Sequence, residues 1–413
     1  MGISRWFVAA AFFAVSAHVC SVAGASDDEV VLGTTVPLTG AHRRGGADTK
    51  NGYELAIRQV NGRGGVVVNG KRYRLKARYY DDKSDPLQAQ ELIDRLIHTD
   101  GVKFILGPYH AGQNRAVLTT IERNRVPMVD AHSVARGQGT RSRSRGYSFA
   151  VAATPDQYFT PALEFAAAFA AKFGKAANDL RIAMATEDDS FSREVRVGIL
   201  SDVRRLGIAC VIDDQLPENF ESMPATLDKV KKLKPDIFLV SGHDETAMTA
   251  VSEIEKAGAS VPMVAVTHCQ TARLAQQGDR SSNFVFCPVQ WDRAAKHEGA
   301  LFGTSEEFAR VYEKAYDHEP TSVAAQAAAA VYVFADAFNR AQSFEPEEVR
   351  DAISATDLDT FFGHIKFDSQ GTNSEKSLML TQIIDGDYVL IAPHAWAEQE
   401  PVLTKPAVTE QAP

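Results

Sequence analysis

Short apolar segments alternate with helical segments along most of this chain. The run at 30–36 is rich in β-branched residues, and apolar residues at helical spacing follow it at 53–60. Further strands are expected at 73–80, 104–106, 126–129, 181–185, 208–212, 237–240 and 262–266. This alternation is typical of doubly wound parallel sheets. Because the pattern restarts near Tyr147, we expect an α/β fold with two parallel-sheet lobes.

The pattern changes after residue 291. Three helices are expected there, at 304–317, 322–342 and 346–355. A long helix is also expected earlier in the chain, at 155–173. Apolar runs at 378–384 and 388–391 flank Asp385-Gly386-Asp387, which predicts a hairpin. The polar, proline-containing end, residues 394–413, is expected to be a flexible tail.

Four histidines lie just past the carboxyl ends of predicted strands. They are His110, His132, His243 and His268. In open α/β sheets, ligands bind in the crevice outside the carboxyl ends of the strands. The sequence therefore predicts a ligand cleft with several imidazoles in its wall.

The first 25 residues have the features of a secretory signal peptide. Arg5 precedes an apolar run at 6–15, and Ala23-Gly24-Ala25 supplies small residues for cleavage. The run is too short for a stable membrane anchor. We therefore expect export to the periplasm. A lipoprotein modified at Cys20 is the alternative, but His18-Val19 matches a lipid-attachment site poorly.

Charge and cysteine content restrict the function further. The formal net charge of −9 argues against nucleic-acid binding, which needs a basic surface. Cys269 and Cys287 end two successive predicted strands, so they can pair in an oxidising compartment, although sequence alone leaves this open. Cys210, in an apolar run, is expected to be a buried thiol.

Several motifs carry a family resemblance over residues 30–393. They are VPLTG at 36–40, NGYELA at 51–56, ILGPY at 105–109 and GHIKFD at 363–368. In their order and spacing, the chain resembles the type I periplasmic solute-binding proteins, and in particular the leucine/isoleucine/valine-binding components of ABC importers.

The resemblance implies two lobes that close over a ligand by hinge motion. Three crossovers would fall near 149–152, 287–291 and 363–368. Lobe one would comprise 29–150 plus 290–364, and lobe two 151–288 plus 366–393. The implied partners are a small solute and an inner-membrane permease, with a monomeric protein, no cofactor and no chemical step.

The resemblance also locates the ligand-binding positions, and here the chain departs from the amino-acid binders. Where those proteins usually have a serine, this chain has Ala111, preceded by His110. Where they have an Ala-Thr pair, it has Ser133-Val134, preceded by His132. A lobe-two position that is often acidic corresponds to His268.

The remaining candidates are Phe191 and His243, at places where aromatic residues often close over the ligand. Arg43 and Arg44, expected in a glycine-rich loop at 40–46, can add charge-assisted bonds to an anion. These substitutions favour a carboxylate or aromatic solute. Amino acids remain open through the family, and Asp130 or Asp244 can still pair with a cation.

The sequence bears on three other functions. A metal or metal-chelate binding protein is an alternative because imidazoles suit zinc or copper, but no His-x-x-x-His or Cys-x-x-Cys spacing occurs among the candidates and no metal ligand is assigned. The chain has no Walker A sequence, Gly-x-Ser-x-Gly elbow or dinucleotide fingerprint, so it is not expected to be an enzyme. An exported sensing subunit for a membrane receptor would use the same fold and cleft.

Overall fold

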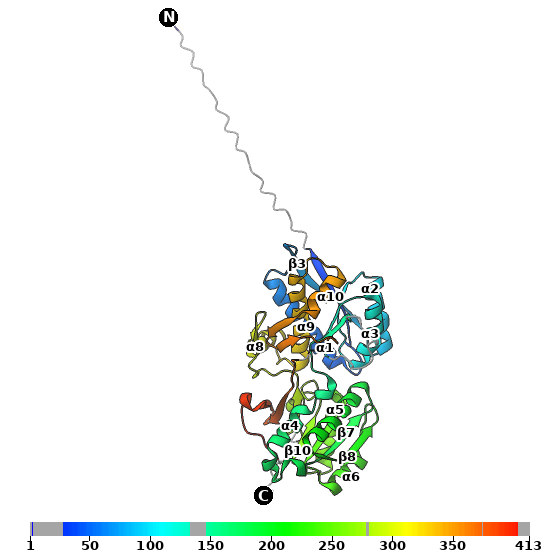
Figure 1. The fold of residues 1–413 in the computed structure, drawn as a ribbon, viewed down its shortest axis with the longest axis vertical. Helices are drawn as coiled ribbons and strands as arrows, with labels where there is room; N and C mark the ends of the chain where they lie inside the picture. Colours follow the sequence, from blue (N-terminus) through cyan, green and yellow to red (C-terminus); the bar gives the residue numbers. More distant parts are fainter. Residues whose placement is uncertain (1, 3–27, 133–145, 278–280, 374, 404–413) are drawn as a thin grey trace.

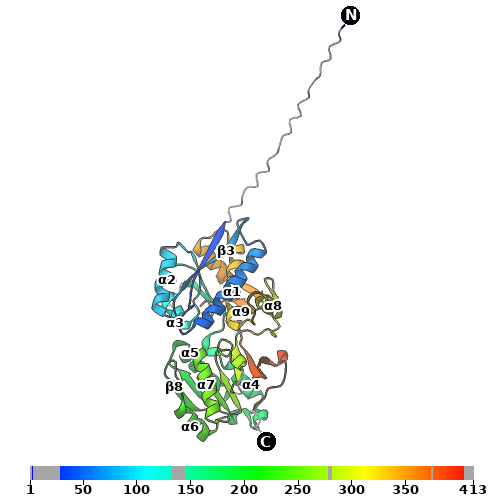
Figure 2. The same ribbon diagram turned by 180° about the vertical axis from the view of Figure 1, so that it is seen from behind.

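The computed structural model describes residues 2, 28–132, 146–277, 281–373 and 375–403. They form two α/β lobes, one above the other in Figure 1 and seen from behind in Figure 2. No helix in this described part is both long and apolar enough to cross a membrane.

The first lobe is built on a six-stranded sheet with the order β2-β3-β1-β4-β5-β6. Its strands are β1 (Glu29–Val36), β2 (Val66–Val68), β3 (Lys71–Asp81), β4 (Phe104–Leu106), β5 (Met128–Asp130) and β6 (Ser148–Ala150). All pairs are parallel except β2 with β3. Helices cover both faces, so the central strands are apolar and almost continuously buried.

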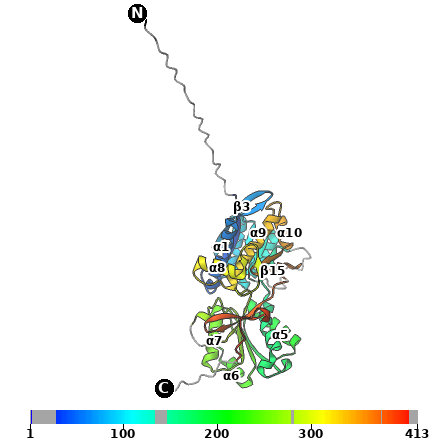
Figure 3. The ribbon, with the colours of Figure 1, turned by 90° about the vertical axis from the view of Figure 1, so that its left-hand side faces the viewer.

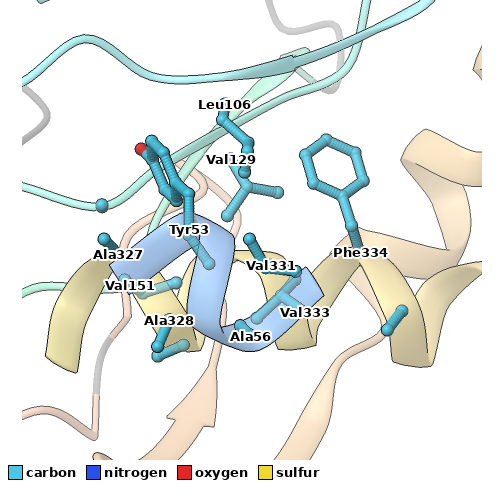
Figure 4. Close-up of a cluster of buried hydrophobic side chains, with 14 of the residues drawn as sticks. Tyr53, Ala56, Leu106, Val129, Val151, Ala327, Ala328, Val331, Val333 and Phe334 are labelled. Atoms are coloured by element: carbon cyan, nitrogen blue, oxygen red, sulfur yellow. The ribbon is translucent and has the colours of Figure 1, made fainter. Parts of the chain in front are cut away.

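Six helices belong to this lobe. They are α1 (Arg43–Gly62), α2 (Pro86–His98), α3 (Ala111–Asn124), α8 (Ser305–Tyr316), α9 (Ser322–Arg340) and α10 (Pro346–Ser354). Figure 4 shows Tyr53 and Ala56 of α1 beside Ala327, Ala328 and Val331 of α9. A Cβ on Gly52 would lie 2.2 Å from the Ala324 carbonyl oxygen, so this close helix approach requires glycine.

The second lobe has a seven-stranded sheet with the order β17-β16-β11-β10-β9-β7-β8. Its strands are β7 (Arg181–Glu187), β8 (Ala209–Leu216), β9 (Ile237–Ser241), β10 (Met263–Val266), β11 (Phe286–Val289), β16 (Met379–Ile384) and β17 (Asp387–Ala392). The strands β16 and β17 are antiparallel to their neighbours, and the others are parallel. The helices α4 (Thr160–Ala168) and α5 (Ser190–Leu206) pack on one face, and α6 (Pro224–Leu233) and α7 (Asp244–Lys256) on the other.

Within the described residues, the chain passes between the two sheets after β6, after β11 and before β16. Figure 3 shows the two lobes from the side. Buried side-chain amides connect the passages between them. The Gln290 side chain exchanges two hydrogen bonds with the backbone of Ala153, at 3.0 and 3.1 Å. Asn373 Nδ2 donates to the carbonyls of Val151 and His364. The three passages therefore form one hydrogen-bonded unit, and the two lobes can rotate about this unit.

Some sequence-based expectations differ from the structure. The helix expected at 155–173 is broken into 3-10 turns at Pro155–Gln157 and Ala170–Phe173 with α4 between them. Pro161, in the first turn of α4, has no N–H to continue a preceding helix. The short strands β2, β14 (Asp357–Thr360) and β15 (Gly363–Lys366) were not expected.

The segment 394–403 was expected to be flexible but packs on the second lobe. It contains a 3-10 turn at His394–Trp396, and the Gln382 side chain bonds the backbone of Val402 in both directions. The expected leader, apart from Gly2, and residues 404–413 lie outside the described part of the chain.

Lys376 is a buried cation next to the last passage between the lobes. Its Nζ donates to the Phe362 carbonyl at 2.6 Å and lies 3.6 Å from the centroid of the Phe362 ring. No described carboxylate forms an ion pair with it, and burial lowers its pKa to about 7.

Replacing Lys376 with methionine should remove a pH dependence of stability. Between pH 7 and 10 the unfolded chain binds more protons at this lysine than the folded chain, so stability rises with pH by up to about 1.4 kcal/mol per unit. Lys376→Met should therefore raise the melting temperature more at pH 7 than at pH 10. Lys232→Met, on an exposed lysine of α6, is the matched control, and equal shifts at both pH values would contradict the argument.

Candidate functional site

The carboxyl ends of the parallel strands in the two sheets border one cavity between the lobes. The first lobe contributes Tyr109, His110, Ala111, His132, Ser322, Val323 and Gln326. The second contributes Tyr158, Phe191, His243, His268, Cys269, Gln270, Thr271, Pro288 and Val289. The cavity measures about 50 Å³, room for a few water molecules at the ~10–15 Å³ that each needs. A larger solute can enter only if the lobes part.

Imidazoles from both lobes meet at this cavity. His110 Nε2 lies 3.0 Å from His243 Nε2 across the cleft. His42 stacks on His110 with ring centroids 4.2 Å apart, and its centroid is 5.2 Å from that of His243. His268 lies 4.7 Å from His243 by the same measure. These four residues are called the histidine cluster below.

Sequence reasoning missed His42. The residue lies in the loop between β1 and α1, so it too follows the carboxyl end of a strand. The rule that selected the other histidines would have found it if it had been extended over the whole of that loop.

His110 and His243 each lie at the N-terminus of a helix. His110 precedes α3, where its Nδ1 accepts from Gly112 N at 3.2 Å and Gln113 Oε1 accepts from His110 N at 3.1 Å. This reciprocal arrangement is a capping box, which orients the side chain at the start of the helix. His243 precedes α7 without a side-chain cap hydrogen bond, and Glu187 Oε2 accepts its backbone N–H at 3.2 Å.

The Asp189 carboxylate lies next to the His243 ring. The carboxylate is buried and caps α5 by accepting from Phe191 N and Ser192 N at 2.7 and 3.1 Å. His243 Nε2 is 3.5 Å away. Burial opposes both charges, but the hydrogen bond and mutual attraction prevail, so the pKa of Asp189 is lowered and that of His243 is raised.

The other imidazoles are neutral at pH 7. Burial lowers the pKa of His42, His132 and His268 to about 3 each. Burial and the neighbouring His243 also lower the pKa of His110 well below its usual value. Each ring therefore has one N–H and one lone pair to offer a ligand.

The loop that carries His268 is held rigidly. His268 has φ 59°, a left-handed conformation that is uncommon for a residue other than glycine. Its ring Nδ1 is 2.8 Å from the Gly242 carbonyl, to which it donates. Cys269 forms a disulfide with Cys287, and the Cys269 carbonyl accepts from the Tyr388 hydroxyl at 2.7 Å. The pairing that sequence left open is thus present.

His132 also lines the cavity, from the first lobe. Its backbone N–H donates to Asp130 Oδ1 at 2.8 Å, and its Nε2 lies 2.9 Å from the Thr49 hydroxyl. Within the described residues, its Nδ1 has no hydrogen-bond partner. Ser133, the neighbouring candidate, lies outside the described residues.

Aromatic rings form the apolar part of the wall. The Phe191 ring meets Tyr158 edge-on at 4.9 Å and His268 at 5.0 Å between centroids. Tyr109 packs edge-on against His132 at 5.2 Å. Ala111, in the first turn of α3, adds a small buried side chain. The cavity can therefore accept a flat apolar group on its second-lobe side.

Arg43 and Arg44 occupy a different setting from the one expected. They begin α1 rather than lying in a loop, because Gly45 and Gly46 are helical residues that allow close packing. A Cβ on Gly45 would lie 2.1 Å from the Tyr109 ring, and a Cβ on Gly46 would lie 2.1 Å from the Pro37 carbonyl oxygen. Arg43 is exposed, Arg44 reaches Met248 Sδ at 3.9 Å, and neither lines the cavity.

Comparison with known proteins now adds to this geometry. The family model described as periplasmic binding protein matches residues 29–387, so the chain belongs to that family. It is 26% identical over 405 residues to Leu/Ile/Val-binding protein homolog 7 of Brucella suis biovar 1, covering 94% of this chain and 96% of the relative.

Solved structures share the fold. A leucine-binding protein from Thermotoga maritima has a TM-score of 0.73 and 19% identity, over 88% of this chain and 98% of that one. An ABC-transporter solute-binding protein from R. palustris, in complex with benzoate, has a TM-score of 0.72 and 18% identity, over 88% and 95%. The family and these relatives are solute-binding proteins and not enzymes.

Removing the disulfide should destabilise the second lobe. The bond closes a loop with a sequence separation of 18, for which chain entropy predicts about 3 kcal/mol. The double change Cys269→Ala with Cys287→Ala should lower the free energy of unfolding by that order in urea titrations. Cys210→Ala removes a free thiol from the same lobe as a control. An unchanged urea midpoint in the double variant would contradict the prediction.

Proposed function

We propose that this protein is the periplasmic subunit of an ABC importer that captures a small aromatic carboxylate between its lobes. The solute enters when the lobes part, its ring lies against Tyr158 and Phe191, and its carboxylate accepts hydrogen bonds from the imidazoles. Closure is a population shift driven by tighter binding to the closed state. The closed monomer then docks on a membrane permease.

The composition of the cavity wall carries this proposal. Among the described residues that line it, there is no Asp, Glu, Lys or Arg. An α-amino acid brings an ammonium group, and burying that charge without a carboxylate partner is costly. A carboxylate needs only donors, which imidazole, hydroxyl and amide groups supply. The wall therefore favours an acid without an amino group.

The nearby carboxylates are engaged behind the wall. Asp244 accepts from the Thr271 hydroxyl at 2.6 Å, and Asp48 accepts from the Thr321 hydroxyl at 2.9 Å. Glu187 accepts from the His243 backbone and Asp189 caps α5. These acids hold the loops in place, which leaves the solute to meet imidazole, hydroxyl and amide groups.

Helix dipoles add to the preference for an anion. The first residues of α3 and α9 line the cavity from one lobe, and Phe191 of α5 and the residue before α7 line it from the other. The positive ends of four helices thus surround the site, and negative charge is stabilised near helix N-termini.

Relatives of this fold are consistent with such a ligand. The R. palustris protein mentioned above binds benzoate, and a solute-binding protein from Rhodopseudomonas palustris BisB5 was solved with 3,4-dihydroxybenzoic acid. Two observations support the periplasmic location: the family, and the leader-like residues at 1–25.

Ligand binding should select aromatic acids over amino acids. Calorimetry on protein refolded to remove bound solute, in EDTA, should give heat with benzoate or hydroxybenzoates. Phe191→Leu should weaken this binding by up to about tenfold, because an aromatic pair contributes about 0.5–1.5 kcal/mol. Val197→Ala, on the exposed face of α5, should leave affinity unchanged.

Two results would contradict this proposal. One is binding of leucine, isoleucine or valine with no response to any aromatic acid. The other is aromatic-acid binding that Phe191→Leu and Val197→Ala weaken equally, since that would place the solute outside the cavity.

A further inference from the structure

The histidine cluster contains more imidazoles than a carboxylate needs. Among the described residues, one nitrogen from each of His42, His110 and His243 lies within 4.8 Å of the others. We propose that these three residues bind a divalent first-row transition-metal ion, such as Zn²⁺, with His268 as a fourth ligand. This site does not depend on the identity of the solute.

The spacing of the ring nitrogens suits such an ion. Zn–N bonds of about 2.0–2.1 Å at tetrahedral angles place ligand nitrogens about 3.3 Å apart. The His110 and His243 Nε2 atoms are already 3.0 Å apart. Small rotations of His42 and His268, whose centroids lie 5.2 and 4.7 Å from that of His243, would complete the shell.

The hydrogen bonds of the rings also fit a metal. His268 donates from Nδ1 to the Gly242 carbonyl, which leaves Nε2 as the coordinating atom. Metal-bound histidines almost always donate their other N–H to such an acceptor. Coordination by His110 Nε2 would exchange its 3.2 Å cap bond from Gly112 for the metal.

The donor set determines the class of ion. Ca²⁺ and Mg²⁺ prefer oxygen ligands, and this cluster offers nitrogen. Imidazole suits Zn²⁺, Cu²⁺ and Ni²⁺. Asp189, 3.5 Å from His243 Nε2, places one carboxylate beside the ion.

The ion would join the two lobes. His42 and His110 precede α1 and α3 of the first lobe, and His243 and His268 follow β9 and β10 of the second. A metal held by both pairs exists only when the lobes are together, so it stabilises the closed conformation by its binding free energy. The metal would act as a tie between the lobes at the edge of the solute cavity.

The test is zinc titration of the purified full chain after EDTA treatment and dialysis. We expect one Zn²⁺ per chain, a rise in melting temperature, and a smaller radius of gyration in X-ray scattering. Co²⁺ in place of Zn²⁺ should give the visible absorption of a tetrahedral nitrogen site. Ca²⁺ and Mg²⁺ should have no effect.

His42→Ala is the decisive variant, because the His42 ring makes no hydrogen bond to any described residue and its loss should leave the fold intact. Zinc affinity should fall at least tenfold in His42→Ala and in His243→Ala. His98→Ala, an exposed histidine on α2, should bind zinc as the parent does.

Unchanged zinc affinity in His42→Ala and His243→Ala would overturn the site, as would equal losses in His98→Ala. Zinc binding without a decrease in the radius of gyration would overturn the proposal that the metal joins the two lobes. Because the aromatic acids are titrated in EDTA, failure of the solute proposal and failure of the metal proposal give separate results.

Discussion

The contact between His110 and His243 joins the two lobes directly at the cavity. It places two buried ring nitrogens 3.0 Å apart across the cleft. The His110 ring caps the helix that it precedes, and the His243 ring lies 3.5 Å from the Asp189 carboxylate. The contact therefore depends on the relative position of the two lobes. A rotation that separates the lobes must break this contact.

Few other polar contacts reinforce it within the described residues. Gln270 Oε1 accepts from Ser322 N at 2.8 Å, and Arg115 pairs with Glu194 at 3.5 Å between α3 and α5. The Arg115 pair is partly exposed and contributes little. The buried amides of Gln290 and Asn373, in contrast, lie in the passages between lobes and need not break when the lobes rotate. The contact between His110 and His243 lies at the cavity, where a bound solute can affect it.

The sequence predicted the large-scale architecture because that depends on repeated local patterns. Buried β-branched runs alternating with amphipathic helices led to two parallel-sheet lobes, and both are present. The same patterns located His110, His132, His243 and His268 at strand ends, and all four line the cavity. Such positions follow from the topology of the sheet and need no knowledge of side-chain packing.

What the sequence did not predict depends on contacts between distant segments. Glycines at 45 and 46 suggested a loop, but their partners are the Tyr109 ring and the Pro37 carbonyl, which no local pattern reveals. Once the helix begins at Arg43, neither arginine lines the cavity, and His42 stacks on His110 of the cavity wall. Helix packing in the first lobe thus determines which side chains lie at or beside the cavity. An error in where α1 begins placed two guanidinium groups in the expected cleft and left out His42, so the nitrogen groups at and beside the cavity are imidazoles and amides without arginine.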